Sequence, residues 1–82
     1  MTKSRDIWIR VLETISENPN INCVSLAKKA KLNNGTITKY SSIGEATGLI
    51  KIIKKGNQKF HTITEKGKRF LSELKIGKEN EK

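Results

Sequence analysis

The stretch LNNGTITKYSSIGEATGLIKIIKKGNQKFHTIT, residues 32–64, predicts a helix that leads directly into a β-hairpin. Asn33 is a favourable N-cap residue for a helix over residues 34–46. Gly48 follows this helix, where the chain needs the left-handed conformation that ends many helices. Two glycines inside the helix lower its intrinsic stability, so tertiary packing is expected to hold it.

Two segments after this helix, residues 49–53 and 59–63, have compositions typical of β-strands. Between them stands Gly56-Asn57, a dipeptide that readily adopts positive φ and therefore predicts a tight turn. A β-hairpin is expected over residues 50–63.

Two further helices are predicted before this stretch. The first has an apolar face formed by Ile7, Trp8, Val11, Leu12 and Ile15. The sequence Asn-Pro-Asn at residues 18–20 ends this helix, and Ile21 is expected to add a short extended segment. Asn22 is a good N-cap for a second helix over residues 23–31, in which Val24 is expected to lean inward.

A fourth helix is predicted after the hairpin. Thr64 is its cap, residues 65–76 form it, and Gly77 is expected to end it. We therefore expect one domain over residues 4–76 and a disordered charged tail over residues 77–82. The fold class is mainly α with a small β-hairpin (α+β), in the order helix-helix-helix-strand-strand-helix.

Basic charge is concentrated in the middle of the chain. Residues 18–64 contain eight lysines and one acid, Glu45, so they hold a net +7 of the chain's +9. A one-sided cationic surface suits a polyanion, and nucleic acid is the commonest one. We find no stretch long enough for a membrane span and no secretory signal, and the lone Cys23 agrees with a reducing compartment. The protein is expected to be cytoplasmic, nucleoid-associated in a cell, and without a membrane partner.

The residue types that enzymes need are scarce in this chain. It has one histidine, His61, one cysteine, Cys23, and scattered acids, so no nucleophile-base pair or metal site is expected. There is also no glycine-rich loop with the lysine and hydroxyl signature of a nucleotide-phosphate site. We expect no catalysis, no metal and no cofactor, with Cys23 and His61 in structural roles.

Two motifs resemble those of winged helix-turn-helix regulators. The first is a polar cap at Asn33 followed by TITKY at residues 36–40 and GLI at residues 48–50. The second is ITEKGKRFL at residues 63–71, at the end of the hairpin. Over residues 7–74 the chain is similar to small archaeal winged-helix DNA-binding proteins, and more loosely to regulators of the MarR and PadR kind.

The chain departs from this pattern in two places. Ser41 and Gly44 stand where the family usually has leucines inside the third helix, and Trp8 is expected to fill the space that they leave. The archaeal relatives have a long C-terminal helix that pairs as an antiparallel coiled coil. The helix predicted here has only about three turns, too short for a sustained heptad seam.

The resemblance implies binding to double-stranded DNA, with the helix of residues 34–46 in the major groove. Asn34, Thr38 and Ser42 are spaced i, i+4 and i+8, so they share one outward face. A solvated polar face with no ligand is the alternative interpretation of this row. The residues expected to contact DNA from the helices are Lys28, Lys29, Asn33, Asn34, Gly35, Thr36, Thr38, Lys39 and Ser42.

The hairpin corresponds to the wing of this family, which lies on the flanking backbone or in the minor groove. Lys54, Lys55 and Lys59 are expected to contact phosphates, and Asn57 or Gln58 to touch the minor-groove edge. The basic surface also leaves two other functions open, a winged helix that binds a protein partner and one that binds RNA. A homodimer through the first and last helices is a further expectation.

Overall fold

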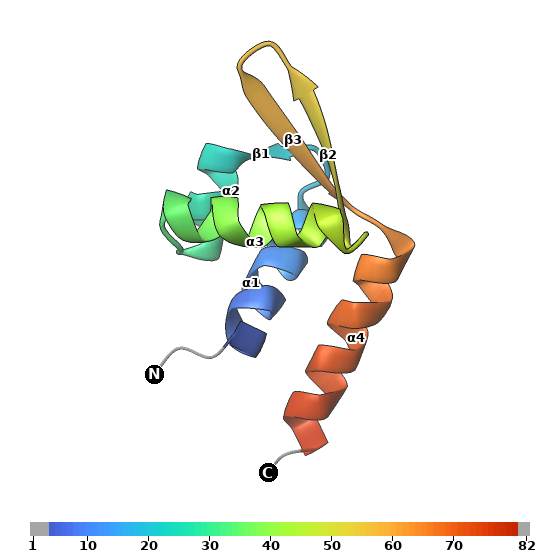
Figure 1. Ribbon diagram of the computed structural model, residues 1–82. Helices are drawn as coiled ribbons and strands as arrows, with labels where there is room; N and C mark the ends of the chain where they lie inside the picture. Colours follow the sequence, from blue (N-terminus) through green and yellow to red (C-terminus); the bar gives the residue numbers. More distant parts are fainter. Residues whose placement is uncertain (1–3, 81–82) are drawn as a thin grey trace.

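The computed structural model describes residues 4–80, and the side chains of residues 4–76. In chain order the elements are α1 (Ser4–Glu17), β1 (Ile21–Asn22), α2 (Cys23–Ala30), α3 (Asn34–Ala46), β2 (Ile50–Lys55), β3 (Gln58–Ile63) and α4 (Glu65–Asn80) (Figure 1). The β2–β3 hairpin projects from one end of the helical body, and α3 lies across the molecule below it. The predicted class, mainly helical with a hairpin wing, is confirmed.

Local capping chemistry sets the limits of α2 and α3. Asn22 Oδ1 accepts a hydrogen bond from Ser25 N at 2.8 Å, and Asn33 Oδ1 accepts one from Thr36 N at 2.7 Å. Each cap satisfies a backbone N–H that the first turn of a helix leaves without a partner. Gly48 after α3 has φ +83°, as predicted for a helix end.

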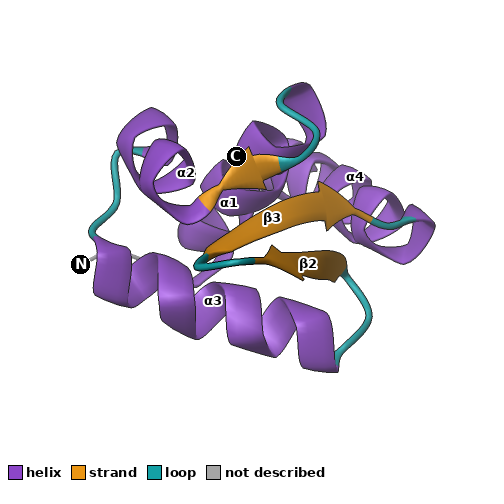
Figure 2. Ribbon diagram, turned by 90° about the horizontal axis from the view of Figure 1, so that it is seen from above, coloured by secondary structure: helices purple, strands orange, loops and turns teal. Residues whose placement is uncertain are grey.

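Within residues 4–80, three strands form one antiparallel sheet in the order β1-β3-β2 (Figure 2). The extended segment expected at Ile21 is therefore a strand: Ile21 pairs with His61 of β3. At the root of the wing Ile50 pairs with Ile63. The sequence predicted only the two strands of the hairpin, because two residues are too short to show an alternating pattern.

The core forms where α1, α2, α3 and the sheet meet. Its fully buried side chains include Leu12, Ile15, Leu26 and Ile37. β2 lies beside α3, as Figure 2 shows, and a Cβ on Gly44 would stand 2.6 Å from Cδ1 of Ile50. Gly44 is therefore small because β2 approaches α3 there.

Trp8 does not fill the space beside Gly44, so that prediction is wrong. Its ring instead packs edge-on against Tyr40, with centroids 4.9 Å apart, and against Phe70, with centroids 6.0 Å apart. Edge-to-face aromatic pairs of this kind stabilise beyond the area they bury. The three rings join α1, α3 and α4.

The fourth helix runs further than the sequence predicts. α4 continues to Asn80, so Gly77 lies inside it and does not end it. A glycine costs a helix only about 1 kcal/mol, and the lysine and glutamate that follow favour the helical state. The division into a domain of residues 4–76 and a disordered tail of residues 77–82 stays a prediction, and residues 81–82 lie outside the described part of the chain. Of the helices described, none is long and apolar enough to cross a bilayer.

Thr64 fixes the junction between the wing and α4. Its backbone N–H donates to the Leu49 carbonyl at 3.1 Å, and its Oγ1 donates to the Gly48 carbonyl at 2.6 Å. The same Oγ1 accepts from Gly67 N at 3.0 Å, so Thr64 caps α4 as predicted. The two ends of the wing are thereby tied to each other and to the last helix.

Candidate nucleic-acid interface

The polar row of α3 faces away from the core. Asn34, Thr38 and Ser42 are exposed, whereas Ile37 and Ser41 are buried. The predicted division of this helix into an inner and an outer face is therefore present in the structure. The row is free to meet a ligand.

The pairing of the two wing strands determines which lysines lie on the side of the wing that faces α3. Lys54 and Lys59 are directly opposite each other on β2 and β3, and Ile52 pairs with His61 two residues further in. Because side chains alternate along a strand, these four share one face of the hairpin. Lys55 belongs to the other face, where it borders a separate hollow beside Asn20, Ile53 and Phe60.

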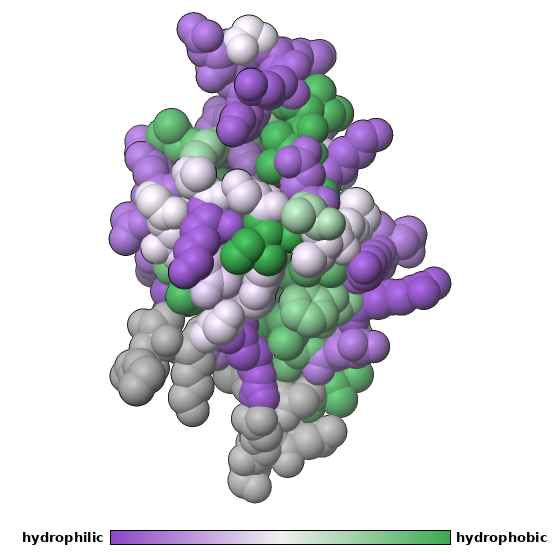
Figure 3. Space-filling model, viewed as in Figure 1, coloured by the Kyte–Doolittle hydropathy of each residue, from purple (hydrophilic) through white to green (hydrophobic). Residues whose placement is uncertain are grey.

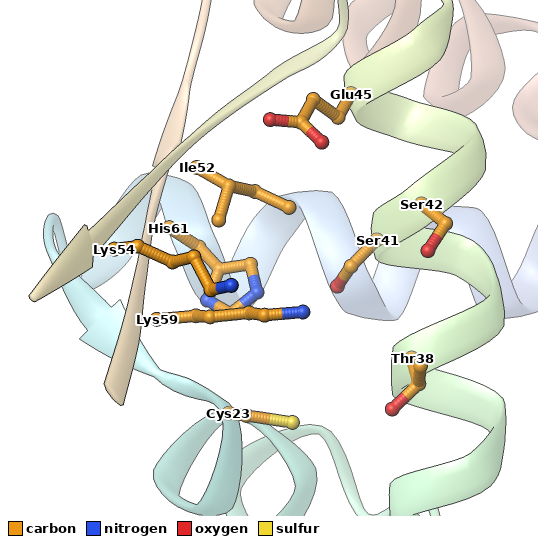
Figure 4. A pocket seen from close by; sticks show the side chains of 9 residues that line it. All are labelled: Cys23, Thr38, Ser41, Ser42, Glu45, Ile52, Lys54, Lys59 and His61. Atoms are coloured by element: carbon orange, nitrogen blue, oxygen red, sulfur yellow. The ribbon is translucent and has the colours of Figure 1, made fainter. Parts of the chain in front are cut away.

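A groove of about 320 Å³ separates α3 from this face of the wing (Figure 4). It is lined by Cys23, Thr38, Ser41, Ser42, Glu45, Ile52, Lys54, Lys59 and His61. In Figure 4 the hydroxyls of Thr38 and Ser41 point into the groove, and the Lys59 side chain extends toward α3 from the opposite wall. The polar row and the basic wing thus border the same space.

A second hollow, of about 440 Å³, continues the groove toward the wing tip. Thr38 and Lys59 line it as well, together with Asn57 and Gln58 of the wing and the start of α2. Val24 also lines this hollow and is 57% exposed, so the prediction that it leans inward is wrong. It stands in the first turn of α2, on the side of the helix that faces this hollow.

Two groups at the floor of the groove are buried. His61 is 1% exposed, and its Nδ1 lies 3.0 Å from the Ile21 carbonyl oxygen, to which it donates. This bond ties β3 to β1 and accounts for the structural role expected of His61. Ser41 is 5% exposed, and its Oγ has no hydrogen-bond partner among the described residues.

Other predicted contact residues lie outside the groove. Asn34, Gly35 and Lys39 are exposed along α3, and Lys28 and Lys29 are exposed on α2. The Asn33 side-chain oxygen is already used by the cap, and Thr36, half-buried, supplies the N–H that it binds. Asn33 and Thr36 therefore shape the start of α3, and their contact with DNA stays a prediction.

Sequence reasoning missed several residues that line the groove. Ser41 was assigned to the inner face of its helix, and Glu45, His61 and Cys23 were given no part in a binding surface. Period-two alternation from Lys54 gives Ile52 as a neighbour on the same face. The same alternation from Lys59 gives His61, and helical spacing from Thr38 gives Ser41 and Glu45. Cys23 follows only from the packing of distant segments, for which the sequence carries no local signal.

The face that carries α3 and the wing has both polar and apolar side chains. Figure 3 shows hydrophilic side chains over the tip of the projecting hairpin, a hydrophobic area on its flank, and a band of near-neutral hydropathy across the middle that contains a hydrophobic area. No group of three or more histidine, cysteine or acidic side chains that could hold a metal occurs in the described part of the chain. The surface offers hydroxyls, amides and ammonium groups.

A helix-turn-helix with a basic hairpin wing is the arrangement of a winged helix-turn-helix protein. A family model described as "Winged helix-turn-helix" matches residues 3–82. The chain belongs to the winged helix-turn-helix family. The comparison with curated proteins gives no match.

Solved structures of archaeal and bacterial proteins are similar to this chain. Sso10a-2, a DNA-binding protein from Sulfolobus solfataricus, superposes with a TM-score of 0.86 at 20% identity, over 95% of this chain and 80% of that one. The transcriptional regulator BldR from the same organism gives 0.79 at 27% identity, over 90% and 55%. A MarR-family regulator from Rhodococcus sp. RHA1 gives 0.75 at 22% identity, over 92% and 54%. The chain spans little more than half the length of the last two.

Proposed function

We propose that this protein binds double-stranded DNA, with α3 in the major groove and the wing on the flanking backbone or minor groove. The observation that carries the proposal is the shared groove, in which Thr38 and Ser42 of α3 face Lys54 and Lys59 of the wing. An α-helix fits the major groove of B-DNA, and ammonium groups beside it suit the phosphates at the groove's edge. Transcriptional regulation or a chromatin-type role follows from such binding.

The charge of the surface supports an affinity dominated by phosphates. The exposed lysines of α2, α3 and the wing include Lys28, Lys29, Lys39, Lys54, Lys55 and Lys59. We expect about 4–6 phosphates to be neutralised per protomer, so log affinity should fall with log salt with a slope of about −0.9 per phosphate. No catalytic activity is proposed.

The outer face of α3 favours modest sequence specificity. Thr38 and Ser42 have short side chains, and Asn34 is the member of the row that can pair with adenine in two-point fashion. Gly35 beside it leaves room for close approach of the backbone, since a Cβ there would meet only Asn33 Oδ1, at 3.4 Å. Few base contacts and many phosphate contacts give weakly specific binding.

The similar structures lend support of a general kind. Sso10a-2 is described as a DNA-binding protein and BldR as a transcriptional regulator, and both share this fold. Fold alone does not decide function, because winged helices also bind RNA and proteins. The test must therefore separate these classes.

The proposal is tested by selecting binders from random DNA duplexes, followed by salt titrations with duplex DNA, duplex RNA and heparin. We expect the duplex DNA to bind more tightly than the RNA and heparin. The double variant Lys54→Glu, Lys55→Glu should weaken binding to all sequences alike, whereas Asn34→Ala and Thr38→Ala should alter sequence preference more than the salt slope. Salt-insensitive binding, or a preference for RNA, would refute the proposal.

A homodimer through α1 and α4 belongs to the same proposal. Much of the apolar surface of these helices is used within the chain, where Leu71 is buried and Phe70 packs on Trp8. Ile76 remains 54% exposed and offers the contact. Sedimentation at micromolar concentration should show a dimer that Ile76→Glu converts to a monomer, and a monomeric wild-type protein would end this part of the proposal.

A further inference from the structure

The buried hydroxyl of Ser41 is aimed into the groove between α3 and the wing (Figure 4). Ser41 is only 5% exposed, and no described residue forms a hydrogen bond with its hydroxyl. Buried polar atoms in folded proteins nearly always have a partner, because an unpaired one costs free energy. A ligand in the groove would provide that partner.

The two lysines on the opposite wall of the groove repel each other. Lys54 and Lys59 form a directly opposed cross-strand pair, and like charges in that position repel. The wing has no acidic residue in β2 or β3 to relieve this repulsion. An anion placed between the two ammonium groups and α3 would relieve it.

Other hydroxyls lie around this end of the groove, beside the apolar Ile52, the thiol of Cys23 and the buried imidazole of His61. Thr38 and Ser42 add hydroxyls from the outer row of α3. The one acid of the basic segment, Glu45, lines the groove further along α3, and Figure 4 shows its carboxylate at the end away from Cys23 and Thr38. An anion is therefore expected at the Thr38 end, away from Glu45.

We propose that the groove binds a single phosphate group, held by Lys54 and Lys59 from the wing and by the hydroxyls of Ser41 and Thr38 from α3. Several donors converging on one anion, some of them charged, match the oxygens of a phosphate. The inference deepens the proposed function, since a phosphate of the duplex backbone is one source of this group. A free phosphate compound offers the same chemistry and is the other source.

The experiment compares four single variants in the intact chain. Lys54→Gln and Lys59→Gln remove charges from the groove, and Ser41→Ala removes the buried hydroxyl. Lys51→Gln is the matched control, because Lys51 is exposed on the same strand but pairs with Thr62 on the other face of the wing. One arm measures affinity for a DNA duplex across a salt series, and the other titrates inorganic pyrophosphate while following backbone amide NMR shifts.

In the duplex arm, Lys54→Gln and Lys59→Gln should each lower affinity about ten-fold more than Lys51→Gln, as for loss of a charged hydrogen bond. Ser41→Ala should lower affinity about three- to ten-fold while leaving unfolding stability unchanged or higher, because it removes an unpaired buried hydroxyl. A merely structural serine would lower stability and leave affinity intact. That opposite pattern would overturn the inference.

The two arms separate the sources of the phosphate. If the groove variants lower the affinity for duplex DNA, the phosphate belongs to the DNA backbone. If they change only the amide shifts caused by pyrophosphate, the ligand is a free phosphate compound. If the wild-type protein binds no duplex, the proposed function fails and the pyrophosphate arm decides the groove. If duplex binding occurs but all groove variants match Lys51→Gln in both arms, the inference fails and the proposed function stands.

Discussion

Gly67, in the first turn of α4, allows this helix to pack against the root of the wing. It is buried, and a Cβ built on it would overlap the Leu49 carbonyl oxygen and lie 2.8 Å from Cγ1 of Ile63. Leu49 directly precedes β2, and Ile63 is the last residue of β3. Gly67→Ala should therefore push apart the helix and both ends of the hairpin.

The cost of Gly67→Ala can be estimated from the contacts around it. Overpacking a tight site costs about 1–3 kcal/mol. Displacing the Leu49 carbonyl also weakens the bond that it accepts from Thr64 N at 3.1 Å, worth about 0.5–1.5 kcal/mol. The better helix propensity of alanine offsets up to about 1 kcal/mol. We expect a net loss of about 1–4 kcal/mol in the free energy of unfolding, or about 5–30 °C in Tm.

Thermal and urea denaturation followed by circular dichroism measure this loss. Gly35→Ala is the matched control, because Gly35 is exposed in the first turn of α3 and a Cβ there meets only Asn33 Oδ1, at 3.4 Å. The same substitution should there be neutral or raise stability by up to about 1 kcal/mol. Equal stabilities for the two variants, or a Gly67→Ala protein as stable as the wild type, would refute the reasoning.

Three further predictions follow from single contacts. Glu45→Gln should raise duplex affinity about two- to five-fold at low salt for every sequence, because it removes the acid that repels phosphates from the groove, and fluorescence anisotropy at two salt concentrations measures this effect. Lys31→Gly should raise unfolding stability by about 0.5–1 kcal/mol in urea titrations, because Lys31 adopts φ +60° after α2. Trp8→Ala should lower stability by about 2–4 kcal/mol through loss of the Tyr40 and Phe70 contacts, while the folded fraction measured at low temperature keeps its duplex affinity.

Elements with local chemical signals could be predicted from the sequence. The caps at Asn22 and Asn33 depend on side chains that reach only three residues ahead. Gly48 and Gly56 have positive φ, +83° and +59°, where glycine carries no steric penalty. The helix-turn-helix and the wing therefore follow from short-range rules, and the outward row of α3 follows from helical spacing.

Features set by packing between distant segments could not be predicted. The groove requires a particular distance between the wing and α3, and no local sequence pattern sets that distance. The register that places Lys54 opposite Lys59 does follow locally, from the two-residue turn at Gly56-Asn57. Packing between distant segments also explains Gly44, whose missing side chain makes room for Ile50 of β2. Trp8 was expected there because sequence spacing gives the face of a side chain and not its partner.

The structure divides the chain into α1 and α4, which hold each other, and a cationic part formed by α2, α3 and the wing. α1 and α4 hold each other through the Trp8–Phe70 contact and an ion pair of 2.6 Å between Lys75 Nζ and Glu13 Oε2. An exposed ion pair of this kind adds at most about 1 kcal/mol, so its effect is chiefly to neutralise charge on that side. The cationic segment of residues 18–64 forms α2, α3 and the wing, and its net +7 is concentrated there.

This division affects how sequence preference would arise. If the groove holds a backbone phosphate, the depth and angle of α3 in the major groove are fixed by phosphate contacts on both of its sides. Asn34 and Thr38 then read bases from a position that does not depend on which bases are present. Weak specificity is the expected consequence, because most of the binding free energy is already gained before any base edge is contacted.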